Sequence, residues 1–262
     1  MLATLIGLDH LVVAVRDLEV AADAWRRIGF TLSPRGLHSA HVGSANHTMM
    51  FGQDYLELLA VVTPQPHNQA LRDFLAKREG LERAAFTTTD AAAGADALRA
   101  RGVDSQGPLH FGRPVPLPDG STAEARFSVF RWPPTAYPGG LGIFACQHHT
   151  PEAVWVPALQ NHANGATRIK RVLAATDQPE AEARKLAAAI DGVWRWRGDV
   201  CFVPTGIGRA EIGFAPRAVI AQLAQCDASA LPERGGAAMV IATPTPRPPA
   251  VATGVAVIFE AP

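Results

Sequence analysis

The sequence repeats one order of secondary structure three times, and this repetition restricts the chain to a small set of folds. Each copy opens with a largely apolar run, at 8–15, 81–88 and 169–175, which predicts a strand. A segment with apolar residues at three- and four-residue spacing follows each run and predicts a helix that ends at a glycine. Each copy therefore predicts a strand followed by a helix.

An aspartate stands between the strand and the helix of each copy. Asp17, Asp90 and Asp177 occupy the position where a short acidic side chain caps the first turn of a helix. Short alternating runs with turn signals follow each helix and predict further strands. They lie at 38–42, 47–51 and 55–62, at 123–130 and 141–147, and at 200–204 and 210–214, with a final pair at 237–242 and 254–260.

The composition excludes several classes of protein. The 262 residues contain 24 Lys and Arg against 24 Asp and Glu, so the chain lacks the positive charge that drives binding to nucleic acid or to an acidic membrane surface. Hydrophobic residues make up 48%, which is enough for a real core. No run of 18 apolar residues and no signal-peptide pattern occurs, so we expect a cytoplasmic protein that does not enter a membrane.

The repeated plan, which opens with a histidine in its first strand, resembles the vicinal oxygen chelate superfamily. That superfamily includes glyoxalase I, extradiol dioxygenases and bleomycin-resistance proteins. The resemblance covers about residues 5–215. It is carried by LDHLVVAVRDLEVAADAWRRIGF (8–30), HVGSANHTMMF (41–51), DYLELLAVV (54–62), FGRPVPLPDG (111–120) and FACQHHTPEAVW (144–155).

The resemblance implies an α+β fold in which tandem βαβββ modules form cupped mixed or antiparallel sheets with helices outside. We expect residues 1–156 to hold two paired modules. Residues 157–262 are then expected to hold the third module and a degenerate set of C-terminal strands. Modules of this fold pair across subunits as well as within them, so a homodimer is a possible assembly.

The resemblance also implies a divalent metal, Zn, Mn, Ni, Fe or Co, held in the cup by the first and last strands of the modules. His10 matches the first-strand position and Glu57 the last-strand position of the first module. In the second module the first-strand position falls near Arg83, so one expected ligand is missing. The last-strand position falls near Gln147, and His148 stands beside it. The predicted metal ligands are therefore His10, Glu57, Gln147 and His148.

The residues themselves leave two interpretations of His10 and Glu57 open. Each interrupts an otherwise apolar strand, and a buried carboxylate is costly unless it is paired or coordinated. Imidazole and carboxylate ligands suit a borderline divalent metal. Alternatively, the two side chains bond to each other, to backbone or to water. If Glu57 is not a ligand, burial is expected to raise its pKa and make it a general base.

Other polar residues are candidates for contacts with a substrate. His148 and His149 are adjacent, so they point to opposite faces of a strand; we expect His148 to act in catalysis and His149 to contact the substrate. Asn46 and His47 lie in a segment, 43–47, that reads as a hairpin turn. The resemblance implies that this segment borders the pocket, where both could contact the substrate, and a role in the turn alone is the alternative. Arg113 is expected to hold a carboxylate, unless it is simply solvated.

These features predict a small-molecule protein of one of two kinds. The first is a divalent-metal-dependent lyase, isomerase or dioxygenase that acts on a small oxo- or hydroxy-acid. The second is a metal-free binding protein of the bleomycin-resistance type. Whether the chain is an enzyme is therefore open from the sequence alone.

Overall fold

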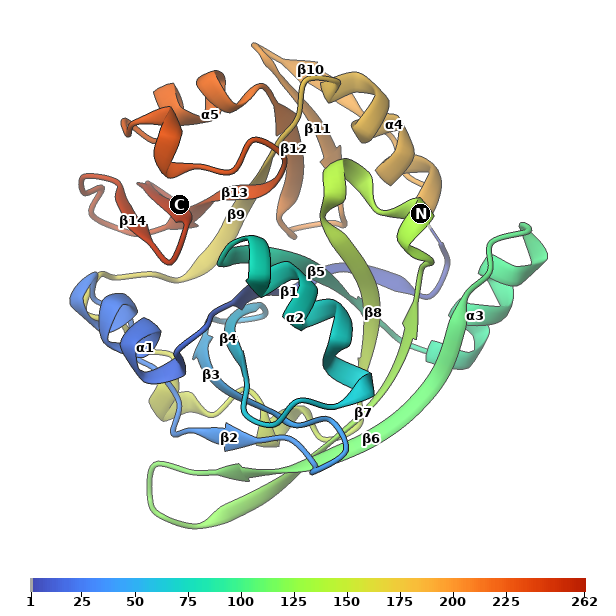
Figure 1. Ribbon diagram of the computed structural model, residues 1–262, viewed down its shortest axis with the longest axis vertical. Coiled ribbons are helices and arrows are strands. Elements are labelled where there is room, and N and C mark those ends of the chain that lie inside the picture. Colours follow the sequence, from blue (N-terminus) through green and yellow to red (C-terminus); the bar gives the residue numbers. More distant parts are fainter. Residues whose placement is uncertain (1) are drawn as a thin grey trace.

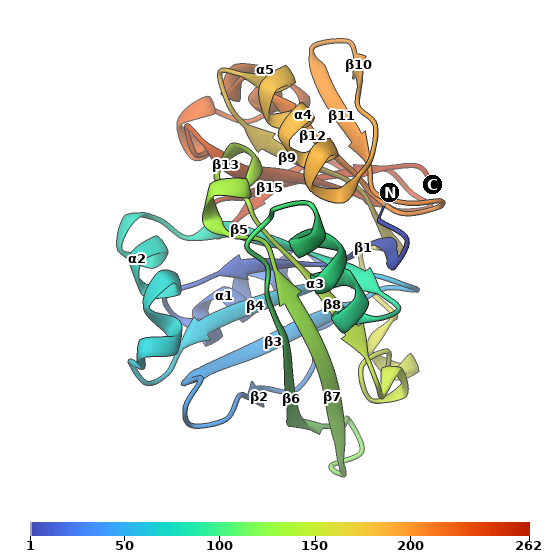
Figure 2. The ribbon, with the colours of Figure 1, turned by 90° about the vertical axis from the view of Figure 1, so that its right-hand side faces the viewer.

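The computed structural model describes residues 2–262, which form two curled sheets with helices packed against them (Figures 1 and 2). Both sheets mix parallel and antiparallel strand pairs. The architecture confirms the predicted α+β fold of cupped mixed sheets with helices outside.

The first sheet has eight strands and the second has seven. The spatial order in the first sheet is β2 (Gly36–Leu37), β3 (Ser44–Met50), β4 (Tyr55–Val61), β1 (Leu5–Ala14), β5 (Gly80–Thr88), β8 (Gly142–His148), β7 (Thr122–Arg131) and β6 (Gln106–Pro116). The order in the second is β10 (Arg195–Arg197), β11 (Val200–Pro204), β12 (Glu211–Ala215), β9 (Arg168–Ala175), β13 (Gly235–Ala242), β15 (Val255–Glu260) and β14 (Ala250–Ala252). The helices are α1 (Leu18–Arg27), α2 (Gln69–Lys77), α3 (Ala91–Ala100), α4 (Pro179–Ile190) and α5 (Arg217–Leu223).

Aspartate caps fix the start of the helix in the first two copies of the plan. Asp17 and Asp90 each accept hydrogen bonds from two backbone N–H groups in the first turns of α1 and α3. The same prediction for Asp177 is wrong, because α4 begins one residue later and its N-cap is Gln178. The hydroxyl of Thr176 accepts a hydrogen bond from the backbone N–H of that residue.

The strand predicted at 38–42 is a turn in the structure. The backbone N–H groups of Val42 and Gly43 both donate to the carbonyl of Ser39, which closes this turn before β3 begins. Gly43 has a φ of +65°, a conformation that glycine adopts without strain. The predicted hairpin turn at 43–47 is consequently wrong for Asn46 and His47, which lie inside β3.

Strand β6 was not predicted, because prolines interrupt its sequence. Pro108, Pro114 and Pro116 lie within it, and a proline lacks the N–H that a central strand must donate. The structure places β6 at the edge of the first sheet, where it pairs with β7 alone. Edge strands tolerate proline because one side of their backbone needs no partner strand.

The two sheets share one apolar core, and two buried tryptophans of the first half also form hydrogen bonds with residues of the second half. The core contains side chains of α1, α3 and α4 together with those on the convex faces of both sheets. The indole N–H of Trp25 donates to the hydroxyl of Thr253, and that of Trp132 donates to the carbonyl of Ala189, each at 3.0 Å. Each tryptophan thus buries its ring and satisfies its one donor.

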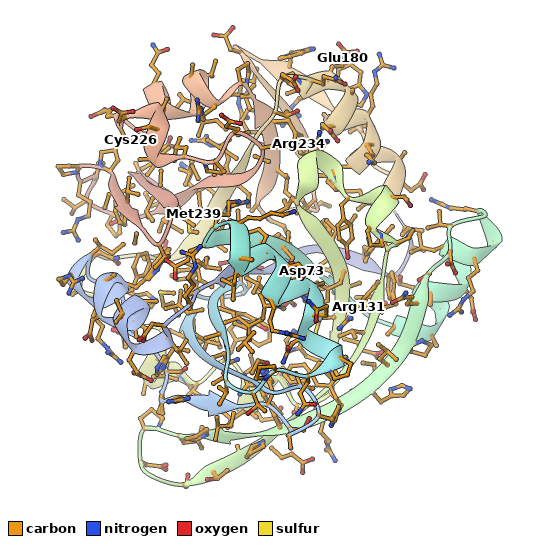
Figure 3. The ribbon with its side chains drawn as sticks, viewed as in Figure 1. Asp73, Arg131, Glu180, Cys226, Arg234 and Met239 are labelled. Atoms are coloured by element: carbon orange, nitrogen blue, oxygen red, sulfur yellow. The ribbon has the colours of Figure 1, made fainter. Side chains whose placement is uncertain are left out.

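Strand β13 approaches β5 closely at Gly236. A Cβ at this position would lie only 2.5–2.6 Å from three side-chain carbons of Leu81, so the contact requires a residue without a side chain. Met239, three residues further along β13, lies fully buried in the core that the two halves share (Figure 3). The two sheets therefore pack against each other through interlocking side chains.

The concave face of the first sheet, here called the first cup, is covered at both ends. Leu71 and Leu75 of α2 pack against Val12 and Leu59 on this face, and Figure 1 shows α2 in front of the curled sheet. The segment around Trp155 packs against the opposite end of the same face. Polar side chains that remain in the cup are therefore shielded from bulk water.

Asp54 is a buried carboxyl group at the junction of the two halves. It is 1% exposed, and the backbone N–H of Ile169 in β9 donates to its Oδ1 at 3.1 Å. Burial raises the pKa of Asp54 to about 7, although this hydrogen bond and the charges of Arg209 and Arg168 lower it. The folded protein therefore keeps a proton on Asp54 at pH values where the unfolded chain has lost it.

We expect Asp54→Asn to stabilise the protein at neutral pH. The folded-state pKa lies above the unfolded one, so the stability of the parent falls as pH rises from about 4 to about 7. The neutral amide avoids this loss, and the gain in unfolding free energy should grow over that range to about 1–3 kcal/mol. Urea unfolding at pH 4.5 and 7.5 measures it. A variant that is less stable at both pH values would contradict the assignment.

Candidate functional site

The centre of the first cup is the buried carboxylate of Asp9. It accepts hydrogen bonds from His10 Nδ1 at 2.6 Å, from His148 Nε2 at 3.0 Å and from the hydroxyl of Thr87 at 2.7 Å. The residue has no solvent exposure. Burial alone would raise the pKa of Asp9, but the two imidazoles hold it well below its ordinary value. Asp9 is therefore an ionised, fully bonded carboxylate.

Asp9 was missed by the sequence analysis because of a bulge in β1. Simple alternation places Asp9 and His10 on opposite faces of a strand. The pairing of β1 with β5 shifts register between Leu8 and His10, and both polar side chains therefore reach the same face. The one signal in the sequence is an Asp-His doublet inside an apolar run.

The hydrogen bonds to Asp9 define which nitrogen of each imidazole is free. His10 gives its Nδ1–H to Asp9, so Nε2 is the ring nitrogen left for another group. This Nε2 lies 4.0 Å from Oε2 of Glu57, too far for a direct hydrogen bond. His148 gives its Nε2–H to Asp9, and its buried Nδ1 has no partner within residues 2–262. His10 Nε2 and His148 Nδ1 are thus the two ring nitrogens that Asp9 does not engage.

Glu57 is held from behind in the same way. Its Oε1 accepts a hydrogen bond of 2.6 Å from the amide of Asn46, which leaves Oε2 facing His10. Burial raises the pKa of Glu57, but His38, His10, the Asn46 amide and Arg113 together hold it below its ordinary value. The expectation of a raised pKa is therefore wrong, because it counted burial alone and not these neighbouring groups.

Aromatic rings surround the free nitrogens of both histidines. Tyr55 stacks on His10 with ring centroids 4.3 Å apart, and the ring of Phe144 meets the edge of His10 at 5.4 Å. Phe127 and Trp155 contact His148 at 5.2 and 4.8 Å. Side chains of this kind exclude water and strengthen the electrostatic interactions inside the cup.

Two of the predicted site residues, His47 and His149, point away from the cup. His47 in β3 points to the convex side, where its Nδ1 bonds to the carbonyl of Ser33 at 2.8 Å. His149 follows β8 and bonds to the hydroxyl of Ser128 through Nε2 at 2.6 Å. The structure does not bring either histidine to Glu57.

The side chain of Gln147 supports the start of α3. Its Oε1 accepts a hydrogen bond from the backbone N–H of Ala91 at 3.0 Å, and its Nε2 donates to the carbonyl of Thr89 at 2.9 Å. Both polar groups of the amide are used in this way. Gln147 therefore faces α3, and the structure does not bring it to His10 and Glu57.

The register of the strands identifies the residue that replaces Glu57 in the second module. Val12 pairs with Glu57 between β1 and β4, and the equivalent pair between β5 and β8 is Ala85 with Phe144. The second module thus has Arg83 in the place of His10 and Phe144 in the place of Glu57. The sequence pattern had matched this position to Gln147, which lies three residues after Phe144 in the chain.

Arg113 closes the cup from the opposite edge of the sheet. It lies on β6 and its guanidinium approaches Gly36 of β2, beside the amide oxygen of Asn46. Its charge lowers the pKa values of Glu57 and His38. Of the predicted substrate-binding residues, Asn46 and Arg113 therefore lie near Glu57.

The side chains of the first cup do not fit a divalent metal held by protein ligands. A catalytic metal such as zinc takes three protein ligands, and only His10 and Glu57 are available at the four matched positions. The other two positions carry a guanidinium and a phenyl ring, Arg83 and Phe144. Across residues 2–262, no group of three or more His, Cys, Asp or Glu side chains gathers as a metal site.

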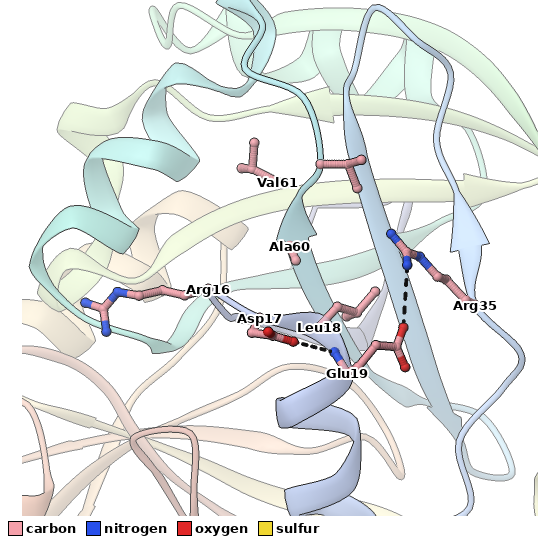
Figure 4. Close-up of a pocket in the computed structure, with 8 residues that line it drawn as sticks. Arg16, Asp17, Leu18, Glu19, Arg35, Ala60 and Val61 are labelled. Atoms are coloured by element: carbon pink, nitrogen blue, oxygen red, sulfur yellow. Dashed lines mark hydrogen bonds and ion pairs between the residues drawn. The ribbon is translucent and has the colours of Figure 1, made fainter.

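A cavity of about 200 Å³ lies outside the cup, where the start of α1 meets β4 (Figure 4). Glu19 projects beside it, with Oε1 3.7 Å from Arg35 Nη1 and Oε2 3.4 Å from His47 Nε2. None of the residues around Asp9 lines this cavity. The helix start is already capped by Asp17, so the cavity adds no second set of reactive groups.

The second sheet repeats the register of the first but not its polar residues. Arg171 takes the place of His10, because β9 pairs with β12 and β13 as β1 pairs with β4 and β5. Its guanidinium forms an ion pair with Glu260. Gly213 takes the place of Glu57 by the same pairing. The histidine and glutamate positions of the first cup are therefore not repeated in the second sheet.

Within residues 2–262 no helix is long and apolar enough to cross a membrane.

Comparisons with known proteins follow the fold. Residues 8–190 match the family described as glyoxalase-like domain. No curated protein sequence matches the chain. A hypothetical protein from Staphylococcus aureus is similar in structure, with 12% identity and a TM-score of 0.73 over 97% of this chain and 99% of that one.

Two methylmalonyl-CoA epimerase structures are similar to part of the chain. The Streptomyces coelicolor enzyme, in complex with 2-nitronate-propionyl-CoA, has 21% identity and a TM-score of 0.44, covering 56% of this chain and 99% of its own. The enzyme from Mycobacterium tuberculosis has 21% identity and a TM-score of 0.43, covering 59% of this chain and 96% of its own.

Proposed function

Because the chain belongs to the glyoxalase-like domain family, and through it to the vicinal oxygen chelate superfamily, we propose that it is an enzyme that moves a proton on a small oxygenated acid. One observation carries the proposal. His10 Nε2 and Glu57 Oε2 face each other across 4.0 Å, and each is held from behind by a hydrogen bond. Two such groups suit a reaction that removes a proton and returns one.

The ionised Glu57 carboxylate accepts the proton from a carbon next to the carbonyl or carboxyl group of the substrate. His10 is the second acid–base group, because its hydrogen bond to Asp9 fixes the orientation of the ring. Donation of a proton by His10 to the other face of the same carbon gives an isomer, and Glu57 and His10 then exchange protons with water to regain their starting states. Departure of a leaving group from the carbanion instead gives a lyase reaction.

Arg113 and Asn46 set the pKa and the orientation of the Glu57 carboxylate and position the substrate. A substrate anion beside Arg113 cancels part of the positive charge that lowers the pKa of Glu57. Glu57 then becomes a stronger base when the substrate is bound. The Asn46 amide keeps the carboxylate in one orientation throughout.

A metal-dependent enzyme is the competing form of this proposal, since members of the superfamily often bind divalent metals. The bond from His10 Nδ1 to a carboxylate is also the bond that orients many metal-bound histidines. The cup offers only His10 and Glu57 as ligands at the four matched positions, which argues against a metal-dependent enzyme. Zn, Mn, Ni, Fe and Co are the ions to be tested.

A metal-free binding protein is the second candidate, and the aromatic lining of the cup favours it. Tyr55, Phe144, Phe127 and Trp155 provide the flat apolar contacts that small-molecule sites use. Such a protein would bind ligands without exchanging their protons.

Proton exchange in D₂O separates an enzyme from a binder. Small oxo-, hydroxy- and dicarboxylic acids are incubated with the protein, and NMR follows the signal of the proton next to the carbonyl or carboxyl group. We expect catalysed loss of this signal for at least one acid. An acid that binds, as shown by calorimetry, but never exchanges would contradict the proposal and favour the binding protein.

A further inference from the structure

The second module places an unusual group of positive charges in the same cup. Arg83 occupies the place that His10 has in the first module, and its Nε bonds to Glu82. Arg131 of β7 pairs with Phe144 across the sheet, so its side chain lies on the concave face with the phenyl ring. The two guanidiniums therefore belong to the wall opposite Glu57.

Arg131 is a half-buried cation with no counter-charge of its own. Its side chain makes no hydrogen bond and no ion pair with any residue in 2–262; Figure 3 labels Arg131 among the side chains of the first sheet. Burial and the charge of Arg83 both lower the pKa of Arg131. Burying a guanidinium away from water without a bonded partner costs free energy. A bound anion would supply that partner and remove the cost.

The surroundings of this pair contain too little negative charge to compensate it. Glu82 is the one carboxylate coupled to Arg131, and it is bonded to Arg83. The side chain of Tyr137 interacts electrostatically with both arginines. His67, just before α2, is also coupled to them, and burial together with their charges lowers its pKa and favours its neutral form. The two guanidiniums thus share the carboxylate of Glu82, and Glu57, the other nearby carboxylate, acts on Arg83 and not on Arg131.

Resting on the proposed function, we propose that Arg131 together with Arg83 binds an oxyanion group of the substrate, a carboxylate or a phosphate. Guanidinium groups bind both anions through paired N–H donors. Arg83 and Glu57 lie close enough to interact electrostatically. An anion held at Arg131 therefore directs the rest of a small molecule toward His10 and Glu57. The reacting acid then needs an oxyanion in addition to the carbon that loses its proton.

Calorimetric titration with malonate and with inorganic phosphate tests this site at constant ionic strength. We expect at least one probe to bind the parent and to bind Arg131→Gln at least tenfold more weakly. Arg126→Gln is the matched control, because it removes an exposed guanidinium from the same strand and should change the affinity less than twofold. Preference for malonate or for phosphate identifies the group that the substrate carries.

The expected stability of the variant separates a binding role from a structural one. If Arg131 binds a ligand, Arg131→Gln should unfold at the same or a higher temperature than the parent without anion, because the repulsion from Arg83 is removed. A lower melting temperature together with unchanged malonate and phosphate affinity would overturn the proposal. So would the absence of binding of both probes to the parent. Arg131→Lys, which keeps the charge, should retain part of the affinity.

Failure of this site and failure of the proposed function are distinguishable. Glu57→Gln should bind the probe as tightly as the parent or more tightly, since it removes a nearby negative charge. Loss of probe binding in Arg131→Gln alone supports the anion site even when no acid exchanges its proton. Catalysed exchange in the parent with unchanged probe affinity in Arg131→Gln rejects only the anion site.

Discussion

Glu57→Gln should reduce catalysed proton exchange by about 100- to 10,000-fold, the usual contribution of a general base. The amide has nearly the same shape as the carboxylate but does not accept a proton from carbon. Its oxygen can still accept the hydrogen bond from Asn46, so the fold should be preserved. The initial rate of deuterium incorporation, measured by NMR for parent and variant, gives the effect.

Glu233→Gln is the control for this substitution, because Glu233 has an 89% exposed side chain far from the first cup. It should leave the exchange rate unchanged. A Glu57→Gln protein that exchanges protons within threefold of the parent, while remaining folded by circular dichroism, would remove Glu57 from the reaction.

Asp9→Ala should lower the free energy of unfolding by about 3–5 kcal/mol, the usual effect of breaking a buried charged network. The substitution leaves the N–H groups of His10 and His148 and the hydroxyl of Thr87 without their acceptor. Urea unfolding at pH 7 measures the loss. Asp23→Ala, at an exposed helix position paired only with Arg26, should cost less than about 1 kcal/mol.

The pH dependence of this loss follows from the lowered pKa of Asp9. A carboxylate that ionises more easily in the folded state contributes stability above the pKa of the unfolded chain, and this contribution disappears as pH falls below about 4. The difference between parent and variant should therefore shrink on acidification. A difference that is constant from pH 7 to pH 3 would show that Asp9 acts by packing alone.

If Asp9→Ala does not fold, Asp9→Asn provides the same test. Asparagine keeps one acceptor oxygen and replaces the other by an NH₂ with two donors, so the negative charge and one of the two acceptor atoms shared by His10, His148 and Thr87 are lost. We expect exchange to slow by about 10- to 100-fold, the size found for residues that orient an imidazole. Unchanged exchange would mean that His10 does not depend on Asp9.

Much of the fold was predictable from the sequence because the repeats carry strong local signals. Asp17 and Asp90 mark the helix starts correctly. Glu57 and His10 interrupt apolar strands, and the structure brings both to the same cup. Because side chains alternate between the two faces of a strand, the sequence alone assigns His10 to one face of β1 and Glu57 to one face of β4.

The rest depended on features that single strands do not reveal. The bulge that brings Asp9 to the cup appears only when β1 pairs with β5. The alignment near Gln147 failed because the position matching Glu57 is set by the pairing of β5 with β8. The roles of Arg83 and Arg131 depend on contacts between distant strands. The homodimer, the cytoplasmic location and the division at residue 156 stay predictions.

The central claim is that the first cup moves a proton with Glu57 and His10 and without a protein-held metal. The direct measurement is proton exchange by untagged protein after chelation and dialysis, with metal content determined by elemental analysis in the same sample. We predict that exchange continues at the parent rate with far less than one equivalent of Zn, Mn, Ni, Fe or Co. Loss of exchange on chelation, its recovery with one equivalent of metal, and no metal binding in a His10→Ala/Glu57→Ala variant would contradict the claim.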